Sequence, residues 1–306
     1  MKRKPFVYAV LFLLIAATLS ACQQGVQQVD ESKKTVVVTY SILGSVVKEL
    51  AGDSANIVVL MPNGSDPHEW EPSAKDIETL NKADLIVQNG LELESSMQKV
   101  LKEAGGRGVK TFTAAEHITI RKIGPGEGIA GDPDQAVGAD DPHLWTDPIA
   151  MKNATAALAV QLKKELGIDV DSRSRDLQNR LDGLNEELSG IVATLPAPDR
   201  KLVTGHESMG YFAQRYGFKL IGAIIPSITS QAEVSASSLA ALKKLIEDNK
   251  VKAIFTELGT SSAVADAIGK ETGVKVIRIT THSLPEDGSY FTFERNLAKV
   301  IVEGLK

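Results

Sequence analysis

The feature that most constrains this chain is an alternation of short β-rich apolar runs with helical stretches, which occurs twice. In the first half, the β-rich runs are Thr35–Tyr40, Asn56–Met61, Asp84–Gln88 and Val109–Thr113. In the second half, they are Lys201–Thr204, Lys219–Ile225, Val251–Thr256 and Val274–Thr280. Strands that alternate with helices are typical of parallel sheets. The pattern therefore predicts an α/β protein with two similar α/β lobes, each with a mainly parallel four-stranded sheet, and a single large sheet is the alternative.

One long helix is predicted between the two halves. Its apolar residues step by four and three positions in alternation, at Leu177, Leu181, Leu184, Leu188, Ile191 and Leu195. This spacing places them on one face of a helix, which would be about 35 Å long from Asp171 to Thr194. We therefore expect an N-terminal α/β lobe at residues 35–168, a rigid connecting helix at 169–196 and a C-terminal α/β lobe at 197–306.

The N-terminus has the pattern of an export signal. Three basic residues at positions 2–4 precede an apolar run that ends at Leu19 and is too short to span a membrane. The run leads into Ser20-Ala21-Cys22, which resembles the lipobox of bacterial lipoproteins, and Cys22 is the only cysteine. We expect a lipoprotein signal peptide at residues 1–22, a lipid anchor on Cys22 that holds the protein outside the cytoplasm on the cell membrane, and a flexible tether at 23–34. The alternative is a soluble signal peptide whose cysteine is incidental.

The charge of the chain limits its partners. The net charge is −5, and residues of both signs are mixed along the sequence. This distribution leaves no basic stripe for nucleic acid. We expect a monomer, because nothing in the sequence suggests a larger assembly. Residues 124–141 are rich in Gly, Pro and acidic residues, which predicts a surface loop that either attracts cations or is simply solvated.

Two of the five histidines share an unusual local frame. His68 and His143 both lie in an Asp-Pro-His-x-Trp sequence, and His68 follows one of the predicted strands. Proline restrains the backbone before each imidazole, and the neighbouring Trp can pack against the loop. Such a loop holds a histidine in a defined position, as a metal ligand requires.

Two further histidines follow predicted strands of the second half. His206 comes after Lys201–Thr204, and His282 comes after Val274–Thr280. Ligands of open α/β sheets bind beyond the carboxyl ends of the strands, so these positions favour a shared site. Any one of the four, taken alone, would be interpreted as an ordinary surface or structural histidine. His117 lacks the proline frame, and we do not assign it to the site.

The chain resembles the zinc/manganese solute-binding lipoproteins of bacterial ABC importers. The resemblance runs from the lipobox through Ser65-Asp66-Pro67-His68, Asp141-Pro142-His143-Leu144-Trp145 and Gly205-His206-Glu207 to Gly288-Ser289-Tyr290. It implies two α/β lobes joined by one long helix, a metal held by two ligands from each lobe, and an importer permease with its ATPase as partners. It assigns the ligand role to His68, His143 and His206. The family commonly has an Asp at the fourth position, where this sequence has His282.

The ligand set favours zinc. Imidazole suits zinc, whereas manganese favours oxygen ligands, so four histidines predict a closed, roughly tetrahedral Zn²⁺ site. Glu257 ends a predicted strand and could either bind the metal directly or orient a histidine. In the first case, Mn²⁺ or iron becomes the alternative cargo.

Two other classes of function compete with a metal carrier. A surface zinc hydrolase would use three histidines and an open position, but the His-Glu-x-x-His motif is incomplete, because position 72 is Pro and position 210 is Gly. An adhesin would be compatible with the lipid anchor but would not explain the histidines. We therefore expect a binding protein and not an enzyme.

Overall fold

The computed structural model describes residues 30–124, 127 and 137–306. The chain divides into two compact units, Met1–Lys33 and Lys34–Lys306. In the described part of the first unit, the amide and hydroxyl of Ser32 donate to the Asp30 carboxylate. The expected signal peptide, Cys22 and most of the tether lie outside the described residues, as does much of the segment 124–141.

The first half of this unit contains a parallel four-stranded sheet. Its strands are β1 (Thr35–Val38), β2 (Asn56–Val59), β3 (Leu85–Gln88) and β4 (Lys110–Thr113). Their order across the sheet is β2-β1-β3-β4, and all three pairings are parallel. In the central strand β1, Val36, Val37 and Val38 are completely buried. Burial on both faces explains why β1 is a continuous apolar run rather than an alternating pattern.

The second half repeats this topology. Its strands are β5 (Lys201–Thr204), β6 (Lys219–Ala223), β7 (Ala253–Thr256) and β8 (Lys275–Arg278). The order is β6-β5-β7-β8, again with parallel pairings. The prediction of an α/β protein with two similar four-stranded sheets is confirmed. Strand β5 coincides with its predicted run, whereas β1, β2, β6 and β8 end before their runs do.

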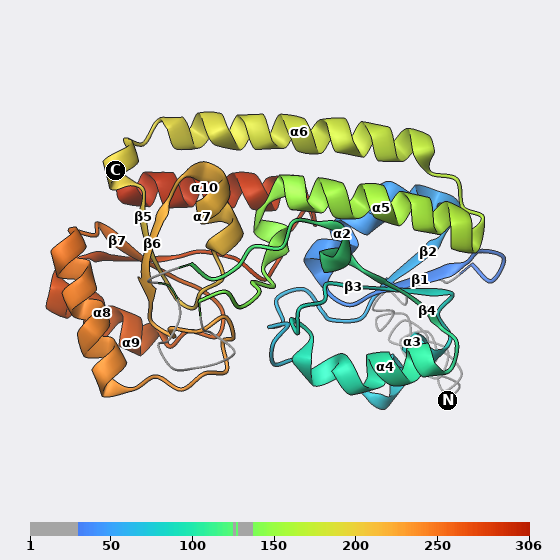
Figure 1. Ribbon diagram of the computed structural model, residues 1–306, viewed down its shortest axis with the longest axis horizontal. Coiled ribbons are helices and arrows are strands. Elements are labelled where there is room, and N and C mark those ends of the chain that lie inside the picture. The colour runs from blue at the N-terminus through green and yellow to red at the C-terminus, as the bar shows by residue number, and fades with distance from the viewer. Residues whose placement is uncertain (1–29, 125–126, 128–136) are drawn as a thin grey trace, which may run out of the picture. The chain divides into compact units, whose positions relative to one another are not determined.

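Helices cover both faces of each sheet (Figure 1). The helices around the first sheet are α2 (Ser41–Ala51), α3 (Ala74–Asn81), α4 (Gln98–Gly106) and α5 (Pro148–Leu166). Those around the second sheet are α7 (Gly210–Tyr216), α8 (Ala236–Asn249), α9 (Ser262–Thr272) and α10 (Tyr290–Leu305). Short 3-10 turns occur at Gly52–Ser54, Ser95–Met97, Ala114–His117, Leu144–Thr146 and Ala197–Asp199. None of the described helices is both long enough and apolar enough to cross a bilayer.

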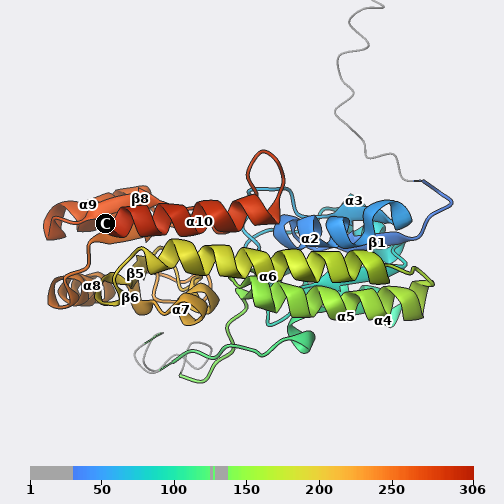
Figure 2. The same cartoon turned by 90° about the horizontal axis from the view of Figure 1, so that it is seen from above.

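The long helix α6 (Asp171–Ala193) connects the halves, and it ends one residue before the predicted end. Leu177, Leu181, Leu184 and Leu188 are buried along one of its faces. It packs against α2 and α5 of the first half and against α10 of the second half. Figure 2 shows α10, α6 and α5 running side by side. A single continuous helix therefore contacts the helical layers of both sheets.

Helix α5 had not been expected from the sequence. It begins at Pro148, and the side chain of the preceding Asp147 caps it by accepting a hydrogen bond from the Ile149 amide. Gly167, with φ of 70°, follows its last residue. Asp-Pro at the start and Gly at the end are strong boundary signals for a helix. Both signals are present in the sequence, but no helix was predicted over this segment.

Candidate metal centre

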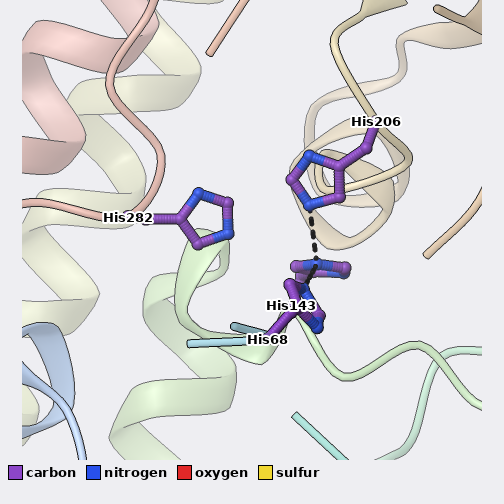
Figure 3. Close-up of side chains that lie close together, drawn as sticks. All are labelled: His68, His143, His206 and His282. Carbon is purple, nitrogen blue, oxygen red and sulfur yellow. Dashed lines mark hydrogen bonds between the residues drawn. The ribbon is translucent and has the colours of Figure 1, made fainter. Parts of the chain in front are cut away.

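Four buried imidazoles from both halves of the protein converge on one point (Figure 3). Each of them offers a ring nitrogen, and these nitrogens lie within 4.8 Å of one another; the residues are His68, His143, His206 and His282. The Nε2 atom of His143 lies 3.3 Å from Nε2 of His68 and 3.3 Å from Nε2 of His206. The Nε2 atom of His282 is buried and has no hydrogen-bond partner among the described residues.

The fifth histidine lies outside this cluster. His117 is exposed, and its ring stacks on Phe112 with 4.6 Å between the ring centroids. It follows β4, as the strand-end argument would allow, but it has no Asp-Pro frame to turn it inward. The structure thus separates His117 from the four histidines that we expected to gather.

The two Asp-Pro-His frames form the same turn. Asp66 Oδ1 accepts a hydrogen bond from the His68 amide at 3.0 Å, and Asp141 Oδ1 accepts one from the His143 amide at 2.9 Å. Asp side chains commonly bond to the backbone two residues on in this way. Asp141 Oδ1 also lies 2.9 Å from Nδ1 of His143. A carboxylate only accepts, so Nδ1 carries the proton and Nε2 presents its lone pair.

The two Trp residues of the frames differ in their role. Trp145 is completely buried, and its ring centroid lies 5.2 Å from that of His143 and 5.5 Å from that of His282. Its Nε1 donates to the Thr281 carbonyl at 2.8 Å. Trp145 therefore holds one imidazole from each half. Trp70 is half-buried and packs against the hydrophobic core.

In the second half, one carboxylate supports both imidazoles. Glu257 directly follows β7 and is 1% exposed. Its Oε1 accepts from the His206 amide at 3.1 Å and lies 3.0 Å from Nδ1 of the same residue. The Thr281 hydroxyl donates to Oε2 and lies 2.8 Å from Nδ1 of His282. The Ser208 hydroxyl also donates to this carboxylate. The Glu257 carboxylate is thus fully engaged by hydrogen-bond donors from the loops that carry His206 and His282.

Burial keeps most of the imidazoles neutral. It lowers the pKa of His68 and His282 well below the ordinary value, and the neighbouring imidazoles lower both pKa values further. Burial also lowers the pKa of His143, although its hydrogen bond to Asp141 opposes this shift. Metal ions bind the neutral form of histidine, so lowered pKa values favour a site that is ready to bind.

The pKa of His206 shifts in the opposite direction. Burial lowers its pKa, but the adjacent Glu257 carboxylate outweighs burial, so the net pKa is raised. Burial alone would raise the pKa of Glu257, yet its contacts with His206 and Thr281 bring it down to about 2. Glu257 therefore remains ionised beside His206, with Oε1 3.0 Å from Nδ1.

Comparison with known proteins identifies the family. A family model described as "Zinc-uptake complex component A periplasmic" matches residues 36–304. The chain belongs to this family. Its members are substrate-binding proteins of ABC metal importers and not enzymes, which confirms the resemblance noted from the sequence and removes the hydrolase alternative.

Named relatives carry different metals. The chain is 29% identical over 282 residues to the high-affinity zinc uptake system protein ZnuA of Bacillus subtilis, covering 90% of this chain and 87% of the relative. It is 28% identical to the manganese ABC transporter substrate-binding lipoprotein PsaA of Streptococcus pneumoniae, covering 96% of each. The solved structure of the periplasmic zinc binding protein TroA from Treponema pallidum superposes with a TM-score of 0.77 and 27% identity, covering 89% of this chain and 99% of that one.

Sequence reasoning missed most of the groups that support the histidines. The repeated Asp-Pro-His frame was a sufficient signal for Asp66 and Asp141, because each aspartate lies two residues before its histidine. Ser208 and Thr281 gave no such signal. They belong to the site because β5, β7 and β8 end next to one another, which is decided by the sheet.

Proposed function

We propose that His68, His143, His206 and His282 together bind one divalent transition metal, with Zn²⁺ preferred, and that the protein delivers this ion to the permease of an ABC importer. The observation that carries the proposal is the convergence of four buried imidazole nitrogens within 4.8 Å, one of them without a hydrogen-bond partner among the described residues. No other group of three or more His, Cys, Asp or Glu side chains in the described part of the chain has metal-binding geometry.

The orientation of the rings supports a cation at the centre. The Nδ1 atoms of His143 and His206 each face a carboxylate at 2.9 and 3.0 Å. With its proton on Nδ1, His143 presents the lone pair of Nε2 toward Nε2 of His206, which lies 3.3 Å away. Once both imidazoles are neutral, a cation between the two Nε2 atoms accepts a lone pair from each. The same carboxylates raise the basicity of the imidazoles as ligands.

The donor chemistry favours zinc over manganese. Four imidazole nitrogens with no carboxylate oxygen match the tetrahedral preference of Zn²⁺, whereas Mn²⁺ prefers oxygen-rich sites. Glu257, the carboxylate best placed to change this set, is already engaged by His206, Ser208 and Thr281. Manganese or iron is the alternative cargo, because the relatives include a manganese lipoprotein as well as a zinc protein.

Elemental analysis and competitive titration of the purified, chelator-stripped protein test this proposal. We expect one tightly bound zinc per chain that a large excess of manganese does not displace. Preferential binding of manganese would show that a carboxylate enters the site and would contradict the four-histidine account. Failure to bind either metal would contradict the site itself.

The proposed setting is the outer face of the cell membrane. Its support is the lipobox ending at Cys22 and the naming of relatives such as PsaA as lipoproteins. In this setting, the protein acts as a monomer, passing metal to a permease driven by its ATPase. Incorporation of labelled fatty acid that disappears in Cys22→Ala would support the anchor. Equal labelling of both proteins would exclude Cys22 as the anchor site.

A further inference from the structure

We propose that Arg121 is a positioning residue for the metal centre, acting on His143 through Asp141 at a point where the two halves of the protein meet. This inference rests on the proposed metal-binding function. Arg121 lies outside every motif discussed above, in the segment between β4 and the second Asp-Pro-His frame. Its side chain is only 8% exposed.

The contacts of Asp141 connect Arg121 to the histidine. Arg121 Nη1 donates to Asp141 Oδ2 at 3.0 Å, while Asp141 Oδ1 takes the amide and Nδ1 of His143, both at 2.9 Å. Each carboxylate oxygen therefore has a separate partner. The guanidinium restrains the rotation of the carboxylate, and the carboxylate in turn sets the plane of the imidazole.

The same pair packs against the second half of the protein. The Arg121 amide donates to the Tyr211 hydroxyl at 3.0 Å. A Cβ atom on Gly210 would lie 2.1 Å from Asp141 Oδ2 and 2.5 Å from Arg121 Nη1, so this glycine leaves the space that the ion pair occupies. Gly210 begins α7, four residues after His206. The ion pair thus sets the position of His143 against the segment that carries His206.

Arginine has a property here that lysine does not share. Its Nη2 also pairs with Glu127, whose carboxylate accepts the Gly124 amide at 3.0 Å. One planar guanidinium therefore satisfies two carboxylates at once, which a single ammonium on a flexible stem does less well. Without Arg121, the Asp141 carboxylate would be buried without a full countercharge, and such a group rearranges.

The test compares two arginine variants of the full chain. Arg121→Met should weaken zinc binding by about tenfold, the lower end of the loss usual for groups that support a metal ligand. Arg215→Met is the matched control, because Arg215 forms a two-pronged pair with Asp147 at 2.9 and 2.7 Å that touches none of the four imidazoles. Zinc affinity is measured by competition with a chromophoric chelator, and thermal unfolding of the metal-free proteins reports the loss of stability separately.

We expect both variants to lose stability but only Arg121→Met to lose affinity. Equal affinity of Arg121→Met and the wild type, or an equal loss in both variants, would overturn the proposal. If Arg121→Met does not fold, Arg121→Lys keeps the test open: it should show a smaller loss of affinity, and unchanged affinity would count against the proposal.

A double-mutant cycle tests the route through Asp141. Asp141→Asn should weaken zinc binding, and adding Arg121→Met to it should cause little further loss, because the two residues act in series. Fully additive losses would show that Arg121 does not act through Asp141. If the wild-type protein binds neither zinc nor manganese tightly, the proposed function itself fails. If the wild type binds and Arg121→Met binds equally, only the inference about Arg121 fails.

Discussion

In the first half of the protein, each histidine lies in a turn held by an aspartate two residues before it, whereas in the second half one glutamate supports both imidazoles. Asp66 and Asp141 cap the turns of their own histidines. Glu257 reaches His206 directly and His282 through Thr281. The halves share a sheet topology but differ in this support. A repeated fold therefore does not imply a repeated site, because the loops after the strands are free to differ.

The largest expected effect comes from removing an imidazole from either half. His143→Ala and His206→Ala should each weaken zinc binding by more than the roughly 100-fold that loss of a supporting group can cost, because a donor atom is removed outright. His117→Ala is the control and should bind as the wild type does. Competition titration measures all three. If His206→Ala kept the wild-type affinity, the second half would not contribute to the site as we propose.

Replacing Glu257 should reduce zinc affinity more than replacing Asp66. Glu257→Gln disturbs two imidazoles and should cost about 100-fold in zinc affinity, whereas Asp66→Asn disturbs one and should cost about tenfold. Asp66 also accepts from the Ser230 hydroxyl at 2.7 Å, and Ser230→Ala removes that contact alone. It therefore serves as the control for Asp66→Asn. Equal losses in the two carboxylate variants would show that Glu257 is not shared.

Replacing His282 tests whether the fourth ligand selects the metal. His282→Asp exchanges a nitrogen donor for oxygen, which should shift relative affinity toward manganese on the order of tenfold. Zinc and manganese titrations of both proteins give the ratio. A ratio equal to that of the wild type would contradict our account of selectivity.

The pH dependence of stability should separate His206 from the other three. The lowered pKa values of His68, His143 and His282 mean that the metal-free fold binds fewer protons than the unfolded chain, so they make stability fall as pH drops through the ordinary value of 6.5. The pKa of His206 is raised in the folded protein. Its contribution to the free energy of unfolding is therefore present at low pH and is lost as pH rises through that raised pKa.

His282→Ala should therefore flatten the loss of stability in acid, and His206→Ala should steepen it. Each change is at most about 1.4 kcal/mol per pH unit, the effect of one proton. Denaturant unfolding of the metal-free proteins between pH 5 and 8 measures the slopes. Slopes that change in the same direction for both variants would contradict the assignment of Glu257 to His206.

The sequence by itself determined the architecture and the four histidines that gather in it. The signals were the apolar strand runs, the spacing of apolar residues in α6 and the paired Asp-Pro-His frames. Each relates residues that are close in the chain, so each can be recognised without a structure. The signal for the start of α5 at Asp147-Pro148 is equally local, although the helix was not predicted.

Tertiary structure alone decided which residues distant in the chain lie beside the histidines. Glu257 lies 51 residues from His206 and 24 from Thr281 in the chain, and Arg121 lies 90 from Tyr211. No spacing rule relates such residues. They meet because parallel strands place their carboxyl ends along one edge of a sheet, and because α6 and its neighbours pack the two sheets into one unit. Buried polar groups must then find partners among whatever side chains that packing brings within reach.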